Sequence, residues 1–281
     1  MAGRRELERR LQALGDIGAI LGVMKNLALM ESSKLSRTLP AQRVMMESLE
    51  ATAADFMTFY PQPDPGSAVS CEILLLVGSQ RGFCGDFNDL IIAALQAAEV
   101  DSTSFRKPLR IVVGDKLAGR LAGDIQLPGF HAVEEIGQII QKVMDAVTTL
   151  LARADGGHTL QLAALYHDPD ISTVVLRSLA PFTSQSNPLL PSSIFPPHLN
   201  ISPPSFFYQM AEQHLLAAIT ELFHRSLMAE SHFRLNHIEG ASRRMERRSS
   251  ELKRKQALAR QEEIIEEIEA ILAGVGEPDG A

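Results

Sequence analysis

Both ends of the chain are long stretches in which helix-breaking residues are almost absent. Residues 4–56 contain one proline, Pro40, and three glycines, Gly15, Gly18 and Gly22, and residues 205–272 contain no proline and one glycine, Gly240. Because an α-helix rises about 1.5 Å per residue, the two stretches span roughly 75 and 100 Å if they are helical. Helices of this length are not stable alone in water. The sequence therefore predicts that they pair antiparallel and bury a shared apolar seam.

The first stretch carries two neighbouring apolar stripes with helical spacing. One stripe follows alternating steps of three and four residues and has polar flanks, which is typical of a coiled-coil seam. The seam residues are Leu7, Leu11, Leu14, Leu21 and Ala28, and the adjoining stripe consists of Ile17, Ile20, Met24 and Leu27.

The last stretch changes character along its length. Between Leu215 and Leu227 it has a broad apolar face, which predicts packing against a globular domain. Beyond Ile238 the apolar stripe thins to about one residue per turn, and it broadens again from Ile264 to Leu272. A helix with so thin a stripe is not the buried interior of a globule.

Charge is also segregated along this last stretch. Residues 241–260 contain eight basic and two acidic side chains, whereas residues 261–281 contain seven acidic side chains and no basic one. Such segregation favours a partner that meets the two parts differently, although a solvated helix face gives the same pattern.

The middle of the chain alternates short apolar runs with helical patterns. We expect strands at 71–77, 110–113, 160–167 and 173–179, and helices at 89–98, 116–122 and 133–152. This order predicts an α/β fold: a Rossmann-like head with a largely parallel sheet and a final antiparallel hairpin, inserted between long N- and C-terminal helices that form an antiparallel coiled coil. The expected segments are 1–60 for the first helix, 67–200 for the head and 204–281 for the last helix, with proline-rich breaks between them.

Composition excludes several classes of protein. A net charge of −7, with no aromatic residues among the basic ones, argues against nucleic-acid binding. Cys71 and Cys84 have no metal-binding spacing, and we expect both to be reduced thiols. The N-terminus lacks the apolar core of a signal peptide, and we find no run that approaches the length of a membrane span. We therefore expect membrane association only through partners.

The stretch Gly78–Asn88 follows a strand and precedes a helix, where a phosphate-binding loop would lie. However, it lacks the Gly-Lys-Ser/Thr ending of a P-loop and the glycine spacing of a dinucleotide site. Cys84 has no histidine near it in sequence, and Asp168 and Asp170 flank a proline as turn residues do. We expect no catalytic residues, no metal and no cofactor in this chain alone.

Three segments resemble the γ subunit of F-type ATP synthases. Residues 20–25 (Ile-Leu-Gly-Val-Met-Lys) are similar to the family's Ile-Thr-Lys-Ala-Met segment. Gly78–Asn88 resembles its Ser-Asp-Arg-Gly-Leu-Cys-Gly-Gly-x-Asn signature. Residues 260–268 resemble its Arg-Gln-x-x-Ile-Thr-x-Glu-Leu segment, and Glu230 and Arg234 fall at the spacing of its Ser-Glu-His-Ala-Ala-Arg-Met segment.

The resemblance implies a noncatalytic rotor subunit. In the family, the paired terminal helices thread the α3β3 ring, and the head sits on the membrane c-ring beside the ε subunit. Rotation forces the three catalytic β subunits through different affinities for nucleotide. The implied contacts with α3β3 are Met24, Arg234, Arg260, Gln261 and Glu267, and those on the ε and c-ring side are Arg81, Gly82, Cys84, Gly85 and Asn88.

The chain departs from the family pattern at several positions. Ile265 replaces the threonine of the third segment, and Asp86 replaces a glycine of the second. These departures suggest a divergent bacterial branch, such as a second rotary ATPase, at the cytoplasmic face of the plasma membrane. Two other classes stay open: a coiled-coil adaptor with an α/β head, and an α/β enzyme with helical arms that binds a ligand at Gly78–Asn88.

Overall fold

A computed structural model describes residues 2–61, 69–101, 108–153, 159–179 and 195–275. Its contacts divide the chain into two compact units. Residues 28–234 form the first, which we call the sheet unit, and residues 1–27 with 235–281 form the second, which we call the paired-helix unit. Two long helices, α1 (Ala2–Phe59) and α5 (Pro203–Val275), run through both units. The sequence predicted another division, into the consecutive segments 1–60, 67–200 and 204–281. That division stays a prediction.

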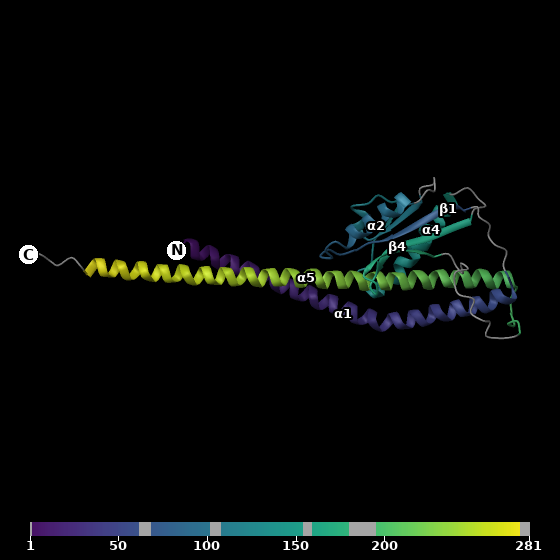
Figure 1. Ribbon diagram of the computed structural model, residues 1–281, viewed down its shortest axis with the longest axis horizontal. Helices are drawn as coiled ribbons and strands as arrows, with labels where there is room; N and C mark the ends of the chain where they lie inside the picture. Colours follow the sequence, from purple (N-terminus) through teal and green to yellow (C-terminus); the bar gives the residue numbers. More distant parts are fainter. Residues whose placement is uncertain (1, 62–68, 102–107, 154–158, 180–194, 276–281) are drawn as a thin grey trace, which may run out of the picture. The chain divides into compact units, whose positions relative to one another are not determined.

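The sheet unit contains a five-stranded sheet of order β3-β2-β1-β4-β5 (Figure 1). The first four strands are parallel and β5 runs antiparallel to β4, as the alternation of apolar runs and helices predicted. In the central register Leu75 lies beside Ile111 on one side and Ala164 on the other. The elements between α1 and α5 are β1 (Val69–Val77), α2 (Phe87–Asp101), β2 (Leu109–Val113), α3 (Asp115–Ala118), β3 (Ile125–Leu127), a 3-10 turn (Val133–Glu135), α4 (Ile136–Arg153), β4 (Thr159–Asp168) and β5 (Thr173–Ser178).

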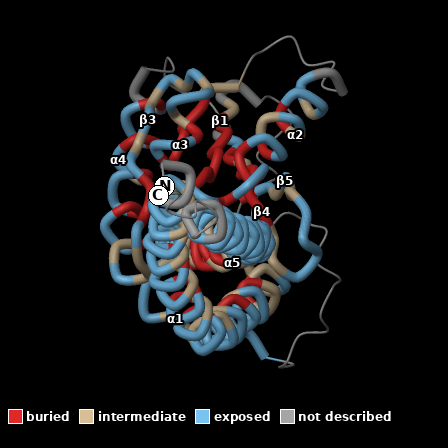
Figure 2. Tube along the Cα trace, turned by 90° about the vertical axis from the view of Figure 1, so that its left-hand side faces the viewer, coloured by how far each residue is buried: buried red, intermediate tan, exposed pale blue. Residues whose placement is uncertain are grey.

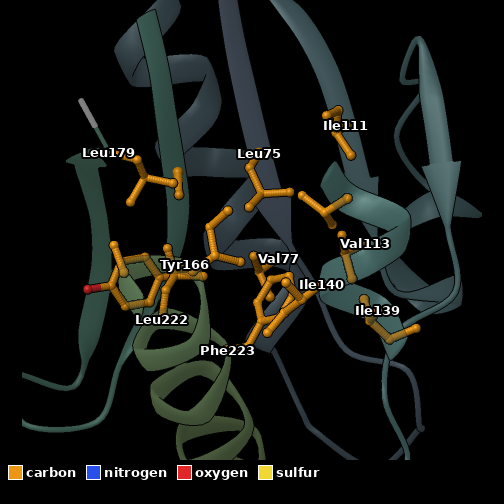
Figure 3. Close-up of a cluster of buried hydrophobic side chains, with 14 of the residues drawn as sticks. Leu75, Val77, Ile111, Val113, Ile139, Ile140, Tyr166, Leu179, Leu222 and Phe223 are labelled. Atoms are coloured by element: carbon orange, nitrogen blue, oxygen red, sulfur yellow. The ribbon is translucent and has the colours of Figure 1, made fainter. Parts of the chain in front are cut away.

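Both faces of the sheet are buried, which explains why its central strands are continuous apolar runs. On one face, side chains of β1, β2 and β4 pack against α4 and against α5 around Leu222 and Phe223 (Figure 3). On the other face, Leu76, Val112 and Leu165 pack against α2. Buried residues accordingly gather on the strands, whereas the part of α5 nearest the viewer in Figure 2 is mostly exposed.

Helices α1 and α5 run antiparallel in each unit. In the sheet unit Phe56 stacks near Phe206, and Ser32 lies 3.4 Å from His232. In the paired-helix unit Gln256 donates a hydrogen bond to Glu8, and Lys25 pairs with Glu239. As residue numbers rise along α1 the partner numbers fall along α5, as predicted.

The two apolar stripes of α1 have different environments. Leu21 and Ala28 of the predicted seam are buried, and Leu7, Leu11 and Leu14 are half-buried. In the adjoining stripe Ile17, Ile20 and Leu27 are exposed, whereas Met24 is half-buried. The seam residues therefore pack between α1 and α5, whereas most of the adjoining stripe is exposed on the isolated chain.

One expectation about α1 was wrong. Within residues 5–59 the helix contains an 18-residue window of mean hydropathy 1.4, long and apolar enough to cross a membrane by composition. Only 11% of that window is buried. The apolar residues are spread over two stripes rather than one run, so inspection for a run missed them. Length and composition alone therefore do not decide whether lipid or protein covers this helix.

The sheet elements agree with the predicted strands to within two residues at their ends. Strand β3 was missed because three residues between Asp124 and Pro128 give no periodicity. The short helix predicted at 116–122 is one turn, α3, because Gly119 caps it. The proline-rich break before the last helix was predicted to be irregular over residues 188–204. Residues 188–194 lie outside the described residues, 195–202 form no helix or strand, and α5 begins at Pro203.

Candidate partner-contact site

The loop from Gly78 to Asn88 joins β1 to α2 at the carboxyl end of the sheet. Asn88 fixes it from within: its side-chain oxygen accepts from the backbone N–H of Ser79, and its amide donates to the Ser79 hydroxyl at 2.8 Å. Gly78 is required by space, because a Cβ atom there would lie 2.2 Å from Leu117. The loop is thus held rigidly at its base.

Gln80 fills the space between this loop and the ends of β2 and β3. Its side-chain oxygen accepts from the backbone N–H groups of Asp115 and Gly129, and its amide donates to the Asp115 carboxylate at 2.6 Å. The first turn of α2 carries Asp89, which opposes the binding of an anion there. A phosphate at the N-terminus of α2 would therefore meet the like charge of Asp89, and the N–H groups of Asp115 and Gly129 are already bound by Gln80.

The crevice between β1 and β4 is filled by aromatic rings. In doubly wound sheets, ligands bind where the strand order reverses, which here lies between these two strands. Phe87 stacks on His167 with ring centroids 4.1 Å apart, and Phe233 of α5 meets Phe87 edge-on at 5.4 Å. The Nε2 atom of His167 lies 2.7 Å from the carbonyl oxygen of Phe87, and burial lowers the pKa of His167. Helix α5 therefore takes part in closing the crevice that a ligand occupies in other folds.

Four charged residues meet beside this crevice: Glu31 of α1, Arg81 of the loop, and Glu230 and Arg234 of α5. Arg81 Nη1 lies 2.8 Å from Glu31, and Arg234 bonds Glu230 and lies 3.6 Å from Glu31. We call these four residues the four-charge cluster. Only Arg81 has a side chain more than 10% exposed.

Cys84 lies against the four-charge cluster. Its sulfur is 3.5 Å from Arg234 Nη2 and 3.7 Å from Glu230 Oε1. Burial, together with the nearby Glu230 carboxylate, raises the pKa of the Cys84 thiol to about 12. Burial likewise raises the pKa of Glu230, opposed by Arg234. The thiol is therefore neutral at physiological pH, which is the opposite of an activated cysteine.

The predicted contact residues fall into two groups. On α5, Arg260, Gln261 and Glu267 are exposed, near Ile264 and Ile265, which are also exposed. In the loop, Arg81 and Gly82 are partly exposed and Gly85 is exposed, whereas Cys84 and Asn88 are buried. Arg234 is only 3% exposed. The contacts predicted for Arg234, Cys84 and Asn88 stay predictions, but in the isolated chain these side chains face other residues of the sheet unit.

Sequence reasoning missed Phe83 at the tip of the same loop. Its side chain is 52% exposed, and its φ of 63° is unusual for a bulky residue. Gly85 follows with φ 59°, which a glycine adopts without strain. A signal was present in the sequence, because the glycines on both sides of Phe83-Cys84 indicate a tight turn.

A family model described as ATP synthase matches residues 3–276. The chain belongs to the ATP synthase γ-subunit family. The match covers both long helices and the sheet unit, so the resemblance seen in three short segments extends along nearly the whole chain. A search of curated protein sequences finds no match.

Solved structures with the same fold are rotor chains of mitochondrial ATP synthases. A chain of the Euglena gracilis rotor, in rotational state 1, has 14% identity and a TM-score of 0.62, covering 94% of this chain and 99% of that one. A chain from the Euglena OSCP/F1/c-ring structure, in rotational state 3, has 15% identity and a TM-score of 0.61, covering 99% and 97%. A chain of the Tetrahymena thermophila central stalk and c-ring has 15% identity and a TM-score of 0.53, covering 79% and 99%. At these identities the likeness shows the γ-type fold, and the family match carries the assignment.

Proposed function

We propose that this chain is the noncatalytic central shaft of a rotary ATP synthase, which couples rotation of a membrane c-ring to ATP synthesis or hydrolysis in α3β3. The single observation that carries this proposal is the family match over residues 3–276. The solved rotor chains come from assemblies described as central stalk with c-ring and as OSCP/F1/c-ring, which supports F1 and the c-ring as partners. We propose ε as a further partner, beside the sheet unit.

The surface of the isolated chain supports a shaft that needs a surrounding partner. Ile17, Ile20 and Val23 on α1 and Ile265 and Ile268 on α5 are exposed large apolar residues. Exposed apolar stripes of this kind mark interaction surfaces. A ring of protein around the helices covers them without a membrane span, so we propose that the apolar window of α1 contacts α3β3 and that the chain reaches the membrane only through partners.

The exposed polar residues of α5 suit the same role. We propose that Arg260, Gln261 and Glu267 contact the ring, together with Met24 of α1. Isolated exposed charges contribute little binding energy each, which suits a part that must release its contacts as it turns. In the sheet unit, we propose that Arg81, Gly82, Cys84, Gly85 and Asn88 form the contact with ε and the c-ring, the buried Cys84 and Asn88 by holding their neighbours in place. We propose that Arg234, which is also buried, serves the contact with the α3β3 ring in the same indirect way.

We further propose that the complex is bacterial and lies at the cytoplasmic face of the plasma membrane, driven by protons or sodium ions. The departures at Asp86 and Ile265 support a divergent branch. In this arrangement residues 1–60 and 204–281 form the shaft and residues 67–200 form the body that meets the c-ring.

Co-expression with α and β from the same genome tests the proposed function. We expect a stable complex with one copy of this chain for every three αβ pairs, and ATP hydrolysis that depends on the chain. Failure to co-purify with any cognate αβ pair contradicts the rotor role and favours a coiled-coil adaptor. A nucleotide bound by the isolated chain at Gly78–Asn88 instead favours an enzyme.

Paired substitutions test the proposed ring contact within the same complex. Arg260→Ala with Gln261→Ala should lower coupled turnover while the sheet unit stays folded, because both side chains are exposed. The matched control is Arg254→Ala with Lys255→Ala, which removes two exposed side chains from the same helix nearly two turns earlier. Equal turnover in the two double variants contradicts a specific contact of Arg260 and Gln261.

A further inference from the structure

The four-charge cluster joins three parts of the chain that are far apart in sequence. Arg81 donates to Glu31 at 2.8 Å across 50 residues, and its guanidinium also donates to the backbone oxygen of His131. Arg234 Nε lies 3.5 Å from the backbone oxygen of Gly82, across 152 residues. Helix α1, the β1–α2 loop and α5 therefore meet through side chains whose hydrogen bonds have fixed directions.

The position of the cluster along both helices is informative. The sheet unit begins at Ala28 on α1 and ends at Arg234 on α5. Glu31 lies within one turn of Ala28, and Arg234 is itself the last residue of the sheet unit on α5. The cluster therefore lies where each helix leaves the sheet unit along the chain.

Burial makes the charges of the cluster interdependent. The side chains of Glu31, Glu230 and Arg234 are 7%, 3% and 3% exposed. Two negative and two positive charges oppose each other there, so removal of one leaves another buried without its partner, which is costly. Glu31 Oε2 and Arg234 Nη1 are buried without a hydrogen bond and lie 3.6 Å apart. A small rotation of either helix thus changes this contact directly.

The neighbouring contacts of α1 within the sheet unit are apolar core contacts, the contact of Ser32 with His232 and the exposed ion pair of Lys34 with Glu134. Leu35 and Met46 belong to the main core, where packing depends on area and tolerates small displacements. Apolar contacts hold a helix in place but do not fix its rotation as sharply as a guanidinium that donates to both Glu31 and the backbone oxygen of His131. Among the charged contacts of α1 near its boundary, the Glu31–Arg81 pair is the more buried, because Lys34 and Glu134 are both exposed.

We propose that the four-charge cluster is a torsional joint within the sheet unit: it fixes the rotation angle of the α1 and α5 segments of that unit against the β1–α2 loop. The inference rests on the proposed rotary function, because only a rotating shaft has to transmit a twist between the sheet and the helix segments packed on it. Glu31 and Arg81 act as positioning residues that stiffen the joint, and they take no part in nucleotide chemistry.

Single-molecule rotation of the assembled complex tests the joint. The α3β3 ring is fixed to a surface, and a bead is attached to the sheet unit at an exposed position through Lys116→Cys. The variance of the bead's angular position is recorded during catalytic pauses. We expect Glu31→Gln to increase the angular variance by about twofold or more, since buried contacts of this kind couple neighbouring elements. Arg81→Lys keeps the charge but loses the forked geometry, and should increase the variance less.

Two controls separate stiffness from stability. Leu150→Ala removes a buried core side chain of α4 away from the cluster, so it lowers stability without loosening the joint. Lys34→Gln removes an exposed ion pair one turn from Glu31 on α1. Both should keep the wild-type variance. If the Glu31→Gln variant does not assemble with α3β3, the Arg81→Lys variant alone tests the joint.

The outcomes distinguish the two proposals. A wild-type complex that neither assembles nor turns contradicts the rotary function, and the joint with it. A wild-type complex that turns, with unchanged variance in Glu31→Gln and Arg81→Lys, overturns the joint alone. A variance in Leu150→Ala as large as that in Glu31→Gln also overturns it, because the cluster would then act only through overall stability.

Discussion

Helix α5 is built in two ways along its length. Within the sheet unit, from Ala217 to Leu227, it buries apolar side chains against the strands, with Leu222 and Phe223 fully covered. Within the paired-helix unit, Leu252 is buried, but Leu258, Ile264 and most other large side chains are exposed. The same element is therefore a core helix in one unit and a surface helix in the other.

The charges on α5 differ in the same way. In the sheet unit Glu221 accepts from Arg177 and Arg225, and Arg225 also binds both carboxylate oxygens of Asp168. In the paired-helix unit the pairs Arg243–Glu239 and Arg248–Glu251 are exposed and lie within the helix itself. Charges in the first segment hold the hairpin of β4 and β5, whereas these pairs in the second segment lie on an exposed helix surface.

Open grooves lie beside the two helices in both units. In the paired-helix unit a groove of about 370 Å³ is lined by Leu11, Leu14, Gly18 and Met245 among others, and in the sheet unit a groove of about 250 Å³ is lined by Leu39 and Arg225 among others. Gly18 brings α1 near α5, since a Cβ atom there would lie 3.2 Å from Met245. The contact between the helices in the paired-helix unit therefore depends on a small residue of α1.

The largest expected effect is on the core segment of α5. Phe223→Ala should destabilise the full chain by about 3–5 kcal/mol, because a fully buried ring leaves a cavity against the sheet. Leu258→Ala, in the exposed segment of the same helix, should leave the urea midpoint nearly unchanged. Equal losses in the two variants would mean that the two segments of α5 unfold as one packed unit.

A second effect comes from the buried charges. Glu221→Gln should cost about 3 kcal/mol, because Arg177 and Arg225 lose the carboxylate between them. The comparison variant Glu239→Gln affects an exposed pair and should not shift the urea midpoint. A Glu221→Gln variant as stable as wild type would show that the hairpin of β4 and β5 is held by apolar contacts alone.

The sequence predicted the strands and the seam of α1 because each depends on local periodicity. Continuous apolar runs such as that ending at Val77 predict a buried parallel strand, and the steps of three and four from Leu7 predict the seam. Strand β3 was missed because Ile125–Leu127 forms only by pairing with β2. Local periodicity therefore predicts the longer elements, whereas the shortest strand forms only through its pairing with a neighbouring strand.

The cluster at the carboxyl end of the sheet could not be predicted, for a different reason. Glu31 and Arg81 are 50 residues apart and Arg234 is farther still, so no spacing rule connects them. The family resemblance pointed to Arg81 and Arg234 but assigned them to partners. Only the fold shows that Glu31 lies between the two arginines and contacts both Arg81 and Arg234.

A smaller effect is expected from pH. Burial lowers the pKa of His167 in the folded sheet unit, so the unfolded chain binds more protons as the pH falls below the ordinary histidine range. Stability should therefore be full above about pH 7 and decline towards pH 5. His167→Phe, which keeps a ring between Phe87 and Phe233, should remove part of that decline, with the rest due to His214, whose pKa burial also lowers. Urea midpoints at pH 7.5 and pH 5.5 test this, and an identical decline in both proteins contradicts it.

The smallest effect is expected in the paired-helix unit. Lys25 and Glu239 pair at 2.9 Å between the two helices, but both side chains are 41% exposed. Water and salt screen such a pair, so Lys25→Gln should leave the thermal midpoint of the helical signal unchanged at physiological salt. Circular dichroism at low and high salt checks this. A lower midpoint that persists at high salt would mean that the pair sets the register of α1 against α5. The contact between the helices in the paired-helix unit would then depend on this pair rather than on the apolar seam alone.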